Sequence, residues 1–439
     1  MKYARKLFAL LLVVLLCLSI GACSKKQEAA VTPPAFVAPQ QIKLGEPMIG
    51  VIYPGTYDIP GTYSYDHHQD ILLAMNRTGM DAETQLLVTE NVADDRASVR
   101  DAVALLTGLG ANVIFSTEFN YSFHMLELAE EYPNTIFCQL GGTDRNGKNL
   151  VDYYGEMYKS YYLTGTLAGM MSLSEETDSI GFVSAYGMDN PDAVAAVNAF
   201  TRGVRSLNSD ATVYLKVLDA AHDYNKEEAA ARALVTQQGC GFLASYTNTS
   251  ATLAAAEYLG VPACGPYFNT ADLASRNELI SPQFNGYKFY FEAIKAAQDS
   301  TYAYEFGNRL GTARFYPSGI GTGLLDIASL SRREDEMLED YMRLYNVIDH
   351  YLEKCAPTDP ADPKYNEDFV MRNEGIFSGH RYDDIQFDSG SVWTKTVEDD
   401  FKDNAGNTIV PAGAISLTTD QIRSMDFYAE GIVVVSDAS

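Results

Sequence analysis

The sequence has little positive charge: 32 Lys and Arg residues stand against 58 Asp and Glu residues, and the formal net charge is −26. The phosphates of a nucleic acid would be repelled by such a chain, so the composition argues against a nucleic-acid partner. It also disfavours binding of an anionic lipid surface by the body of the protein. Tryptophan is limited to Trp393, whereas tyrosine occurs 29 times. An excess of tyrosine suits wet surfaces that also stack on or hydrogen-bond a ligand.

The usual sequence signatures of catalysis are missing. There is no Gly-x-Ser-x-Gly elbow and no His-Glu-x-x-His pair, and the adjacent His67 and His68 would point about 100° apart on a helix. The segment 142–148 matches the spacing of a phosphate-binding loop, but Asn149 stands where Ser or Thr is needed for Mg²⁺. We therefore expect no enzyme activity, no catalytic residue, no metal and no cofactor, and we interpret 142–148 as a solvated connection.

Clustered cysteines are also missing. Cys138, Cys240, Cys264 and Cys355 show no Cys-x-x-Cys motif and no short regular spacing. The first three lie in or beside apolar, strand-like runs, where cysteine is commonly a small buried hydrophobe. A disulfide is possible among these four residues, but the pattern does not demand one.

The N-terminus has the pattern of a secretory signal. Lys2, Arg5 and Lys6 precede the apolar run Leu7 to Ile20, which is too short for a comfortable transmembrane helix. Small residues then lead into Cys23, so the end of the run resembles a bacterial lipobox. We expect residues 1–22 to be removed and Cys23 to carry lipid; an ordinary signal peptide with an incidental cysteine is the alternative.

The residues that follow fit an anchored protein. The segment 23–47 is polar and rich in Ala, Pro, Gln and Lys, so it cannot bury a core and is expected to be a flexible tether. No second long apolar run follows it. The sequence therefore predicts a body held outside the cytoplasm, anchored to the cell membrane by its N-terminal lipid.

Strand and helix patterns alternate along the body, as parallel sheets with helical crossovers require. The rhythm runs once through the first hundred residues of the body and then restarts, which predicts an α/β protein with two similar doubly wound lobes and a ligand cleft between them. The predicted strands are Met48 to Tyr53, Leu86 to Thr89, Ala111 to Ser116, Thr135 to Leu140, Ser179 to Ala185, Thr212 to Leu218, Gly241 to Tyr246 and Pro262 to Gly265.

The predicted lobes are discontinuous in sequence. We assign 48–152 and about 273–320 to the first lobe, and 153–272 with part of 321–439 to the second lobe and a C-terminal extension. An acidic insertion is predicted around 359–396.

Several short segments, in this order and spacing, resemble the basic membrane protein family of substrate-binding lipoproteins. The resemblance implies a type I periplasmic-binding-protein fold, a purine nucleoside or base as ligand, and an ABC permease in the membrane as partner. The segments that carry it are Tyr153-Tyr154-Gly155, Tyr161 to Gly169, Ile180 to Val183, Val197 to Gly203, Pro411-Ala412-Gly413, Leu417 to Asp420 and Met425-Asp426-Phe427.

This chain departs from the family pattern at positions that concern the ligand. Gly61 to Tyr65 replaces a Gly-Trp-Thr-Tyr segment, and Val217 and Ala221 stand at positions where relatives carry tryptophans. Tyr267 stands where nucleoside binders carry the Asp that holds ribose hydroxyls.

Aromatic and polar residues that follow the predicted strands are the ligand-binding candidates. A purine needs flat aromatic faces, and ribose needs Asp- or Asn-type acceptors. We expect Tyr65 and Phe119 to form one wall of the cleft. Asn248 and Asn269 are expected to supply hydrogen bonds to the ligand from the opposite wall. The full set is Tyr57, Asp58, Tyr63, Tyr65, Glu118, Phe119, Asn120, Tyr186, Tyr246, Asn248, Tyr267 and Asn269. Asp189-Asn190-Pro191-Asp192 has the simpler pattern of a helix N-cap.

The function expected from these features is that of a lipid-anchored solute receptor of an ABC importer. It would bind a purine nucleoside or related small molecule between two lobes and perform no covalent chemistry. Two alternatives remain open: a receptor for a sugar or other polar solute, and a signalling or adhesion lipoprotein with the same fold.

Overall fold

The computed structural model describes residues 46–142, 146–174, 176–270, 273, 276–300, 306, 316–318, 325–327, 375–388, 391–414 and 416–436. The predicted signal, Cys23 and the tether as far as residue 45 lie outside these ranges. So do Cys355, residues 143–145 of the segment 142–148, and residues 359–374 of the predicted acidic insertion. No helix in the described ranges is long and apolar enough to cross a membrane.

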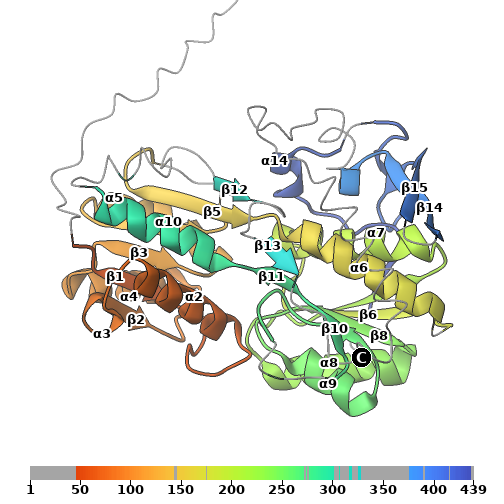
Figure 1. Ribbon diagram of the computed structural model, residues 1–439, viewed down its shortest axis with the longest axis horizontal. Coiled ribbons are helices and arrows are strands. Elements are labelled where there is room, and N and C mark those ends of the chain that lie inside the picture. The colour runs from red at the N-terminus through yellow and green to blue at the C-terminus, as the bar shows by residue number, and fades with distance from the viewer. Residues whose placement is uncertain are drawn as a thin grey trace, which may run out of the picture. The chain divides into compact units, whose positions relative to one another are not determined.

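The first sheet has six parallel strands in the order β12-β5-β4-β3-β1-β2 (Figure 1). Its strands are β1 (Ile49–Ile52), β2 (Leu86–Thr89), β3 (Val113–Ser116), β4 (Ile136–Leu140), β5 (Leu150–Gly155) and β12 (Tyr316–Ser318). The connecting helices are α2 (Tyr63–Arg77), α3 (Ala82–Gln85), α4 (Arg96–Gly108) and α5 (Ser122–Glu131), with the 3₁₀ turn η1 (Phe119–Tyr121) before α5. Four predicted strands are present, but β5 lies where we predicted only a connection.

Helices cover both faces of this sheet, which explains why its central strands are apolar throughout. In β3, Val113 and Phe115 join the core beneath α2 and α10 (Gly286–Gln298), while Ile114 joins a separate core beneath α4 and α5. The period of two along a strand sends alternate side chains to opposite faces. The carboxyl ends of the strands therefore remain the open edge at which loops collect.

The second sheet repeats this plan with the parallel order β10-β9-β8-β6-β7-β18. Its strands are β6 (Ser179–Ser184), β7 (Thr212–Val217), β8 (Phe242–Tyr246), β9 (Ala263–Cys264), β10 (Glu278–Ile280) and β18 (Ile432–Val434). Helices α6 (Met157–Ser174) and α7 (Pro191–Leu207) pack on one face, and α8 (Tyr224–Gln238) and α9 (Ala251–Leu259) on the other. The predicted fold class, α/β with two doubly wound sheets, is confirmed.

Helices α6 and α7 lie against each other with almost no space between their backbones. A Cβ atom added at Gly165 would overlap the Phe200 carbonyl oxygen, and one added at Gly203 would overlap the Tyr162 carbonyl oxygen. At Gly169 the added atom would lie 2.5 Å from the Val204 carbonyl oxygen. Glycine is needed at these positions because of the close approach.

Chain segments after the second sheet return to both lobes. Strand β10 belongs to the second sheet, and α10 then packs against α2 on the first. Strand β11 (Pro282–Phe284) pairs with β13 (Leu325–Ile327), and β18 adds to the second sheet beside β7. Between them lie the hairpins β14–β15 (His380–Asp388, Ser391–Glu398) and β16–β17 (Phe401–Lys402, Thr408–Val410), and the short α14 (Thr419–Ile422). The lobe boundaries given above remain a prediction.

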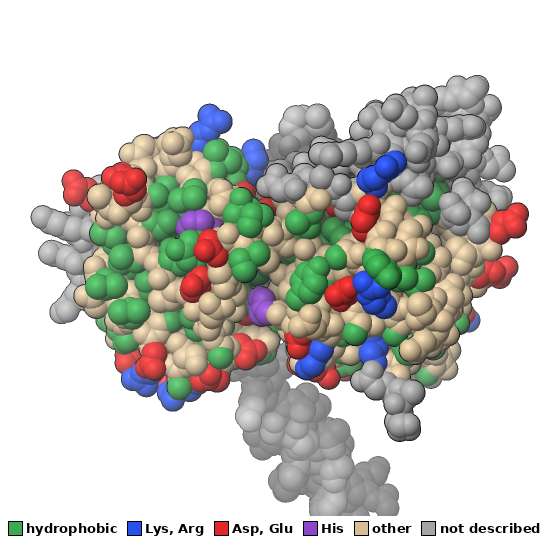
Figure 2. Space-filling model, turned by 90° about the horizontal axis from the view of Figure 1, so that it is seen from below, with side chains coloured by type: hydrophobic (Ala, Val, Ile, Leu, Met, Phe, Trp, Pro, Cys, Tyr) green, Lys and Arg blue, Asp and Glu red, His purple; other side chains and the backbone are tan. Residues whose placement is uncertain are grey.

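The described cysteines Cys138, Cys240 and Cys264 are buried free thiols. They are packed as small apolar side chains, as expected from their neighbours in sequence. On the face shown in Figure 2, the described Lys and Arg side chains are scattered among acidic and uncharged ones and do not gather into a patch.

Candidate ligand-binding site

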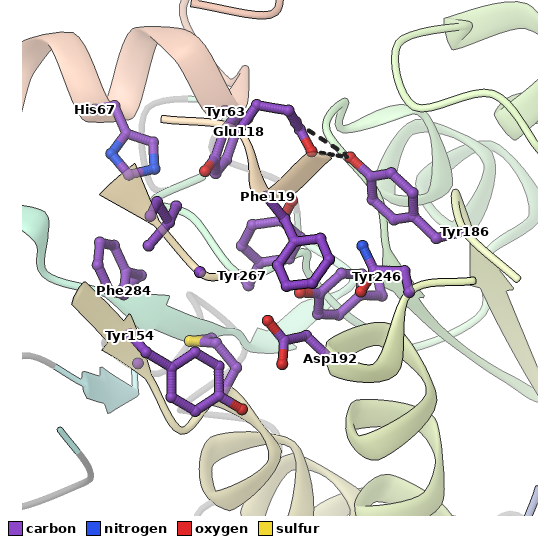
Figure 3. A pocket seen from close by; sticks show the side chains of 15 residues that line it. Tyr63, His67, Glu118, Phe119, Tyr154, Tyr186, Asp192, Tyr246, Tyr267 and Phe284 are labelled. Carbon is purple, nitrogen blue, oxygen red and sulfur yellow. Dashed lines mark hydrogen bonds between the residues drawn. The ribbon is translucent and has the colours of Figure 1, made fainter. Parts of the chain in front are cut away.

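A pocket lies where loops at the carboxyl ends of both sheets meet (Figure 3). Glu118 follows β3, Gly141 follows β4, and Tyr186 and Tyr246 stand after β6 and at the end of β8. This is the edge of an α/β sheet at which ligands commonly bind. The lining residues are Tyr63, His67, Glu118, Phe119, Leu140, Gly141, Tyr154, Gly155, Met157, Tyr186, Asn190, Asp192, Tyr246, Tyr267 and Phe284.

The first-lobe wall depends on a tight turn after β4. Gly141 has a positive φ of 72°, a conformation that glycine adopts without steric cost. The Phe119 ring lies directly against its α-carbon, at the place that a side chain would fill. The ring is further held edge-on by Phe123, with centroids 6.1 Å apart. The turn therefore fixes one aromatic side of the pocket.

Helix α2 supplies two more ring systems to this wall. The buried Tyr63 hydroxyl donates to the Thr117 carbonyl oxygen, and its ring meets His67 edge-on, with centroids 4.4 Å apart. His67 Nδ1 lies 2.6 Å from the Tyr290 hydroxyl. Burial lowers the pKa of His67 to about 3, so the imidazole is neutral at physiological pH.

The second-lobe wall is made of tyrosines at strand ends. Tyr246 and Tyr267 lie with ring centroids 4.5 Å apart and planes inclined by 32°. Tyr267 also meets Tyr63 of the first lobe edge-on, with centroids 5.4 Å apart. Aromatic rings from both lobes thus meet across the pocket. Such rings offer flat apolar faces together with polar hydroxyls.

Hydrogen bonds connect the two lobes directly at this site. The Tyr186 hydroxyl donates to the Glu118 carboxylate at 3.2 and 3.3 Å from its two oxygens and accepts from Asn248 Nδ2 at 3.1 Å. The backbone N–H of Tyr63 donates to the Asn248 carbonyl oxygen at 3.3 Å. Burial raises the pKa of Glu118 to about 7, so this carboxyl group is close to half-protonated near neutral pH.

The first turn of α7 brings a second carboxylate to the pocket. The Asn190 side chain caps the helix by accepting from the backbone N–H of Ala193 at 3.0 Å, and Asp192 stands two residues further on. Tyr154 hydrogen-bonds the Asp192 carboxylate. The Arg423 guanidinium lies 4.5 Å from the centre of the Tyr154 ring and donates to the Gly142 carbonyl oxygen.

The structure brings together only part of the predicted site. Seven predicted residues line the pocket or hydrogen-bond its lining with their side chains: Tyr63, Glu118, Phe119, Tyr186, Tyr246, Asn248 and Tyr267. The side chains of five lie elsewhere: Tyr57, Asp58, Tyr65, Asn120 and Asn269, although the backbone N–H of Asn120 hydrogen-bonds the Glu118 carboxylate. Of the two residues expected to form the first-lobe wall, Phe119 lines this pocket and Tyr65 is not among its lining residues.

Specific contacts explain the misplaced residues. The Tyr57 ring packs on His68, with centroids 4.5 Å apart, and the Asn120 side chain donates to Asp94 at 2.8 Å. Asp58 and Asn269 are exposed. The two contacts join residues 11 and 26 positions apart, so no local sequence pattern records them.

The sequence prediction missed His67, Tyr154, Asp192 and Phe284. His67 could have been found, because it lies one helical turn after Tyr63 and so shares its face. Asp192 was interpreted as part of a helix cap. The cap is present, but Asn190 makes it and both residues also line the pocket.

The described residues contain no group of three or more His, Cys, Asp or Glu side chains that could hold a metal ion. The arrangement suits reversible binding of a small molecule with a flat ring and hydrogen-bonding groups.

Comparison with known proteins decides the family. A family model described as ABC transporter substrate-binding protein, PnrA-like, matches residues 48–304. The chain belongs to this family. Its members are solute-binding components of ABC transporters, a class that acts outside the cytoplasm, takes a small-molecule ligand and works with a membrane permease.

Individual relatives agree with this assignment. A putative ABC transporter glucose-binding protein of Haloferax volcanii is 32% identical over 191 residues, which are 44% of this chain and 47% of that protein. The chain thus spans about half the length of that relative. A purine-binding protein of Brucella abortus is 27% identical over 256 residues, 58% of this chain and 69% of that protein.

The fold is that of solved solute-binding proteins. An ABC transporter solute-binding protein of Conexibacter woesei superposes with a TM-score of 0.50 at 16% identity, over 69% of this chain and 96% of that one. The type I fold expected from the sequence is confirmed.

Proposed function

We propose that this protein is a lipid-anchored receptor of an ABC importer that binds a purine nucleoside or a related small molecule between its two lobes. One observation carries the proposal: aromatic rings and hydrogen-bonding groups from both lobes converge on one pocket, and Tyr186 links them to Glu118. A purine would stack on the rings, while hydroxyl and amide groups would meet its polar edges. No step of this function makes or breaks a covalent bond.

Entry of such a ligand requires the lobes to separate. The free space between the lining side chains holds a few water molecules, less than a nucleoside needs. Separation breaks the bonds from Tyr186 to Glu118 and from Tyr63 to Asn248. A ligand that replaces these contacts from both sides favours the closed arrangement, which the permease then recognises.

The test is a thermal-shift screen followed by titration calorimetry on the body without its first 45 residues. The panel contains inosine, guanosine, adenosine, hypoxanthine, ribose and glucose. We expect a purine nucleoside to raise the melting temperature, because stabilisation grows as RT ln(1 + [L]/Kd). Lack of binding by every purine would contradict the proposal.

A sugar is the second candidate ligand. The Haloferax relative is named for glucose, and sugars also stack on tyrosine rings and bind carboxylates. Preference for glucose over all purines in the same screen would favour this candidate.

Anchoring by Cys23 is a separate part of the proposal. Its support is the apolar run that ends in Gly21-Ala22-Cys23. Cys23→Ala should release the protein from the membrane fraction, and globomycin should leave a larger precursor. Normal acylation and membrane retention of the variant would contradict anchoring without affecting the proposed ligand.

A further inference from the structure

The charges that line the pocket are all acidic. Among the described residues in its wall, Glu118 and Asp192 are the charged ones, His67 is neutral, and no Lys or Arg takes part. A carboxylate accepts hydrogen bonds and does not donate them. The pocket therefore suits a solute that presents hydroxyl or N–H donors.

The two carboxylates are not equivalent. Both oxygens of Glu118 lie within hydrogen-bonding distance of the Tyr186 hydroxyl, so this group joins the lobes. Asp192 is different: its Oδ1 is buried, yet no atom in the described part of the chain donates to it. Buried acceptors without a donor are rare in folded proteins and call for a physical explanation.

Helix capping does not explain Asp192. The Asn190 side chain already accepts from the backbone N–H of Ala193, and the Asp192 carboxylate points into the pocket (Figure 3). Tyr154 hydrogen-bonds the carboxylate from β5. One oxygen thus remains available at a wall shared with the aromatic rings.

The charge of Arg423 keeps Asp192 an acceptor. Burial raises the pKa of Asp192 to about 6, while the guanidinium of Arg423 and the hydrogen bond from Tyr154 oppose the rise. The group is therefore mostly ionised at neutral pH. Arg423 itself donates to the carbonyl oxygen of Gly142 and does not line the pocket.

We propose that Asp192 determines ligand specificity: its Oδ1 accepts a hydrogen bond from one hydroxyl or N–H group of the bound solute, while the rings of Phe119 and Tyr246 hold the flat part. This inference rests on the proposed function and adds the polar anchor to it. The donor belongs either to a nucleoside or to a free sugar, two sources that share the same chemistry.

The experiment compares the parent ligand with analogues that each lack one donor. For inosine these are the three monodeoxy analogues and the N1-methyl analogue; for glucose they are the monodeoxy sugars. Wild-type protein should lose about tenfold or more in affinity for one analogue, the scale of a charge-assisted hydrogen bond. Asp192→Asn should bind the parent ligand about tenfold more weakly than wild type does. It should bind the parent and that analogue with about equal affinity.

Asp189→Asn is the matched control, because Asp189 is an exposed carboxylate three residues earlier, in the loop that leads into α7, and does not line the pocket. It should bind the parent within about twofold of wild type. The melting temperature of ligand-free Asp192→Asn should be no lower than that of wild type, since Oδ1 has no donor to lose. A purely structural role for Asp192 predicts a lower one.

The failures are distinguishable. If wild type binds neither inosine nor glucose nor any other compound of the panel, both the proposed function and this inference are contradicted. If wild type binds a parent but no single-donor analogue loses tenfold, or if Asp192→Asn binds the parent within twofold, the role of Asp192 is overturned and the proposed function stands. The analogue series is measured on wild-type protein, so it can contradict the inference even if Asp192→Asn does not fold.

Discussion

The two lobes share a sheet plan but pack their helices in opposite ways. In the first lobe, aromatic side chains separate α10 from its neighbours: His67 of α2 meets Tyr290 of α10 edge-on, with ring centroids 5.9 Å apart. Phe289 of α10 stacks on Tyr153 of β5, with centroids 3.9 Å apart and planes inclined by 8°. In the second lobe, α6 and α7 meet through glycines, and the backbone at Gly165 and Gly203 touches the partner helix. Side chains set the helix spacing in one lobe, and the backbone sets it in the other.

The same difference in packing determines how each lobe positions its residues at the ligand site. In the first lobe the aromatic layer continues from Tyr153 through Tyr290 to His67. The Tyr153 and Tyr290 hydroxyl oxygens lie 3.1 Å apart, and the Tyr290 hydroxyl oxygen lies 2.6 Å from Nδ1 of His67. In the second lobe the position of α7 decides where Asn190 and Asp192 stand. Changes in the first lobe should therefore act through lost packing, and changes in the second through displaced helices.

The largest effect is expected from removing a ring of the first-lobe layer. Phe289→Ala leaves a cavity beside Tyr153 and should lower the free energy of unfolding by about 3–5 kcal/mol. Phe123→Ala is the matched control because that ring is 67% exposed, and it should cost about 1 kcal/mol or less. Denaturant unfolding measures both. Equal losses would show that the stacked layer does not dominate first-lobe stability.

Adding a single methyl group between α6 and α7 should lower the free energy of unfolding nearly as much as Phe289→Ala does. Gly165→Ala forces a Cβ atom against the Phe200 carbonyl, and we expect a loss of about 3 kcal/mol because backbone cannot move aside as a side chain does. Gly108→Ala adds the same atom at the end of α4, where nothing lies within 4 Å. That control should be neutral or stabilising by up to about 1 kcal/mol. Destabilisation of equal size in both variants would contradict close packing as the cause.

The sequence predicts those features of the structure that depend on residues close together in the chain. The apolar run Ala111 to Ser116 predicts β3, because a strand buried on both faces needs consecutive apolar residues. In contrast, β5 was missed: its polar residues Asp152, Tyr153 and Tyr154 mimic a loop, and only pairing with β4 and β12 makes them a strand.

The same limit applies to the site. Tyr186 and Tyr246 were found because they stand at strand ends, where ligands of such sheets bind. Tyr65 was misplaced because helix α2 already begins at Tyr63, so the residues after it follow a helical face rather than a loop. The role of Asp192 depends on Tyr154 and Arg423, which come from distant segments, and no local pattern records that contact.

Binding should report whether the lobes contribute equally to the pocket. Phe119→Ala removes a first-lobe ring and Tyr246→Ala a second-lobe ring, and each should weaken binding by about tenfold or more, on the scale of base–aromatic stacking of about 1–3 kcal/mol. Tyr65→Ala is the control and should leave affinity unchanged. Titration calorimetry with the ligand found in the screen measures all three. A loss confined to one lobe would show that the ligand does not bridge the cleft.

The smallest effect concerns the bond that joins the lobes without ligand. Burial raises the pKa of Glu118 from an ordinary 4.5 to about 7, so the folded protein holds this proton more tightly than the unfolded chain. The contribution is fully present below about pH 4.5 and is lost as pH rises through 7. Asp70 and Glu227, with pKa values raised to about 7, and Asp66, raised to about 8, act in the same direction.

Glu118→Gln isolates the share of this one group. Glutamine keeps a hydrogen-bond acceptor for Tyr186 and removes the buried charge, so the variant should be more stable than wild type by about 1 kcal/mol at about pH 8. For a body of this size that is about 1–2 °C in melting temperature. The melting temperature of the variant should also fall less steeply between about pH 6.5 and pH 8. This window lies above the range in which His67 and His222, with pKa values lowered by burial to about 3 and about 4, oppose the carboxyl groups. Glu90→Gln, at an exposed position, should leave the slope unchanged. An unaltered slope in Glu118→Gln would contradict a raised pKa for this carboxyl group and show that burial at the lobe junction does not hold its proton.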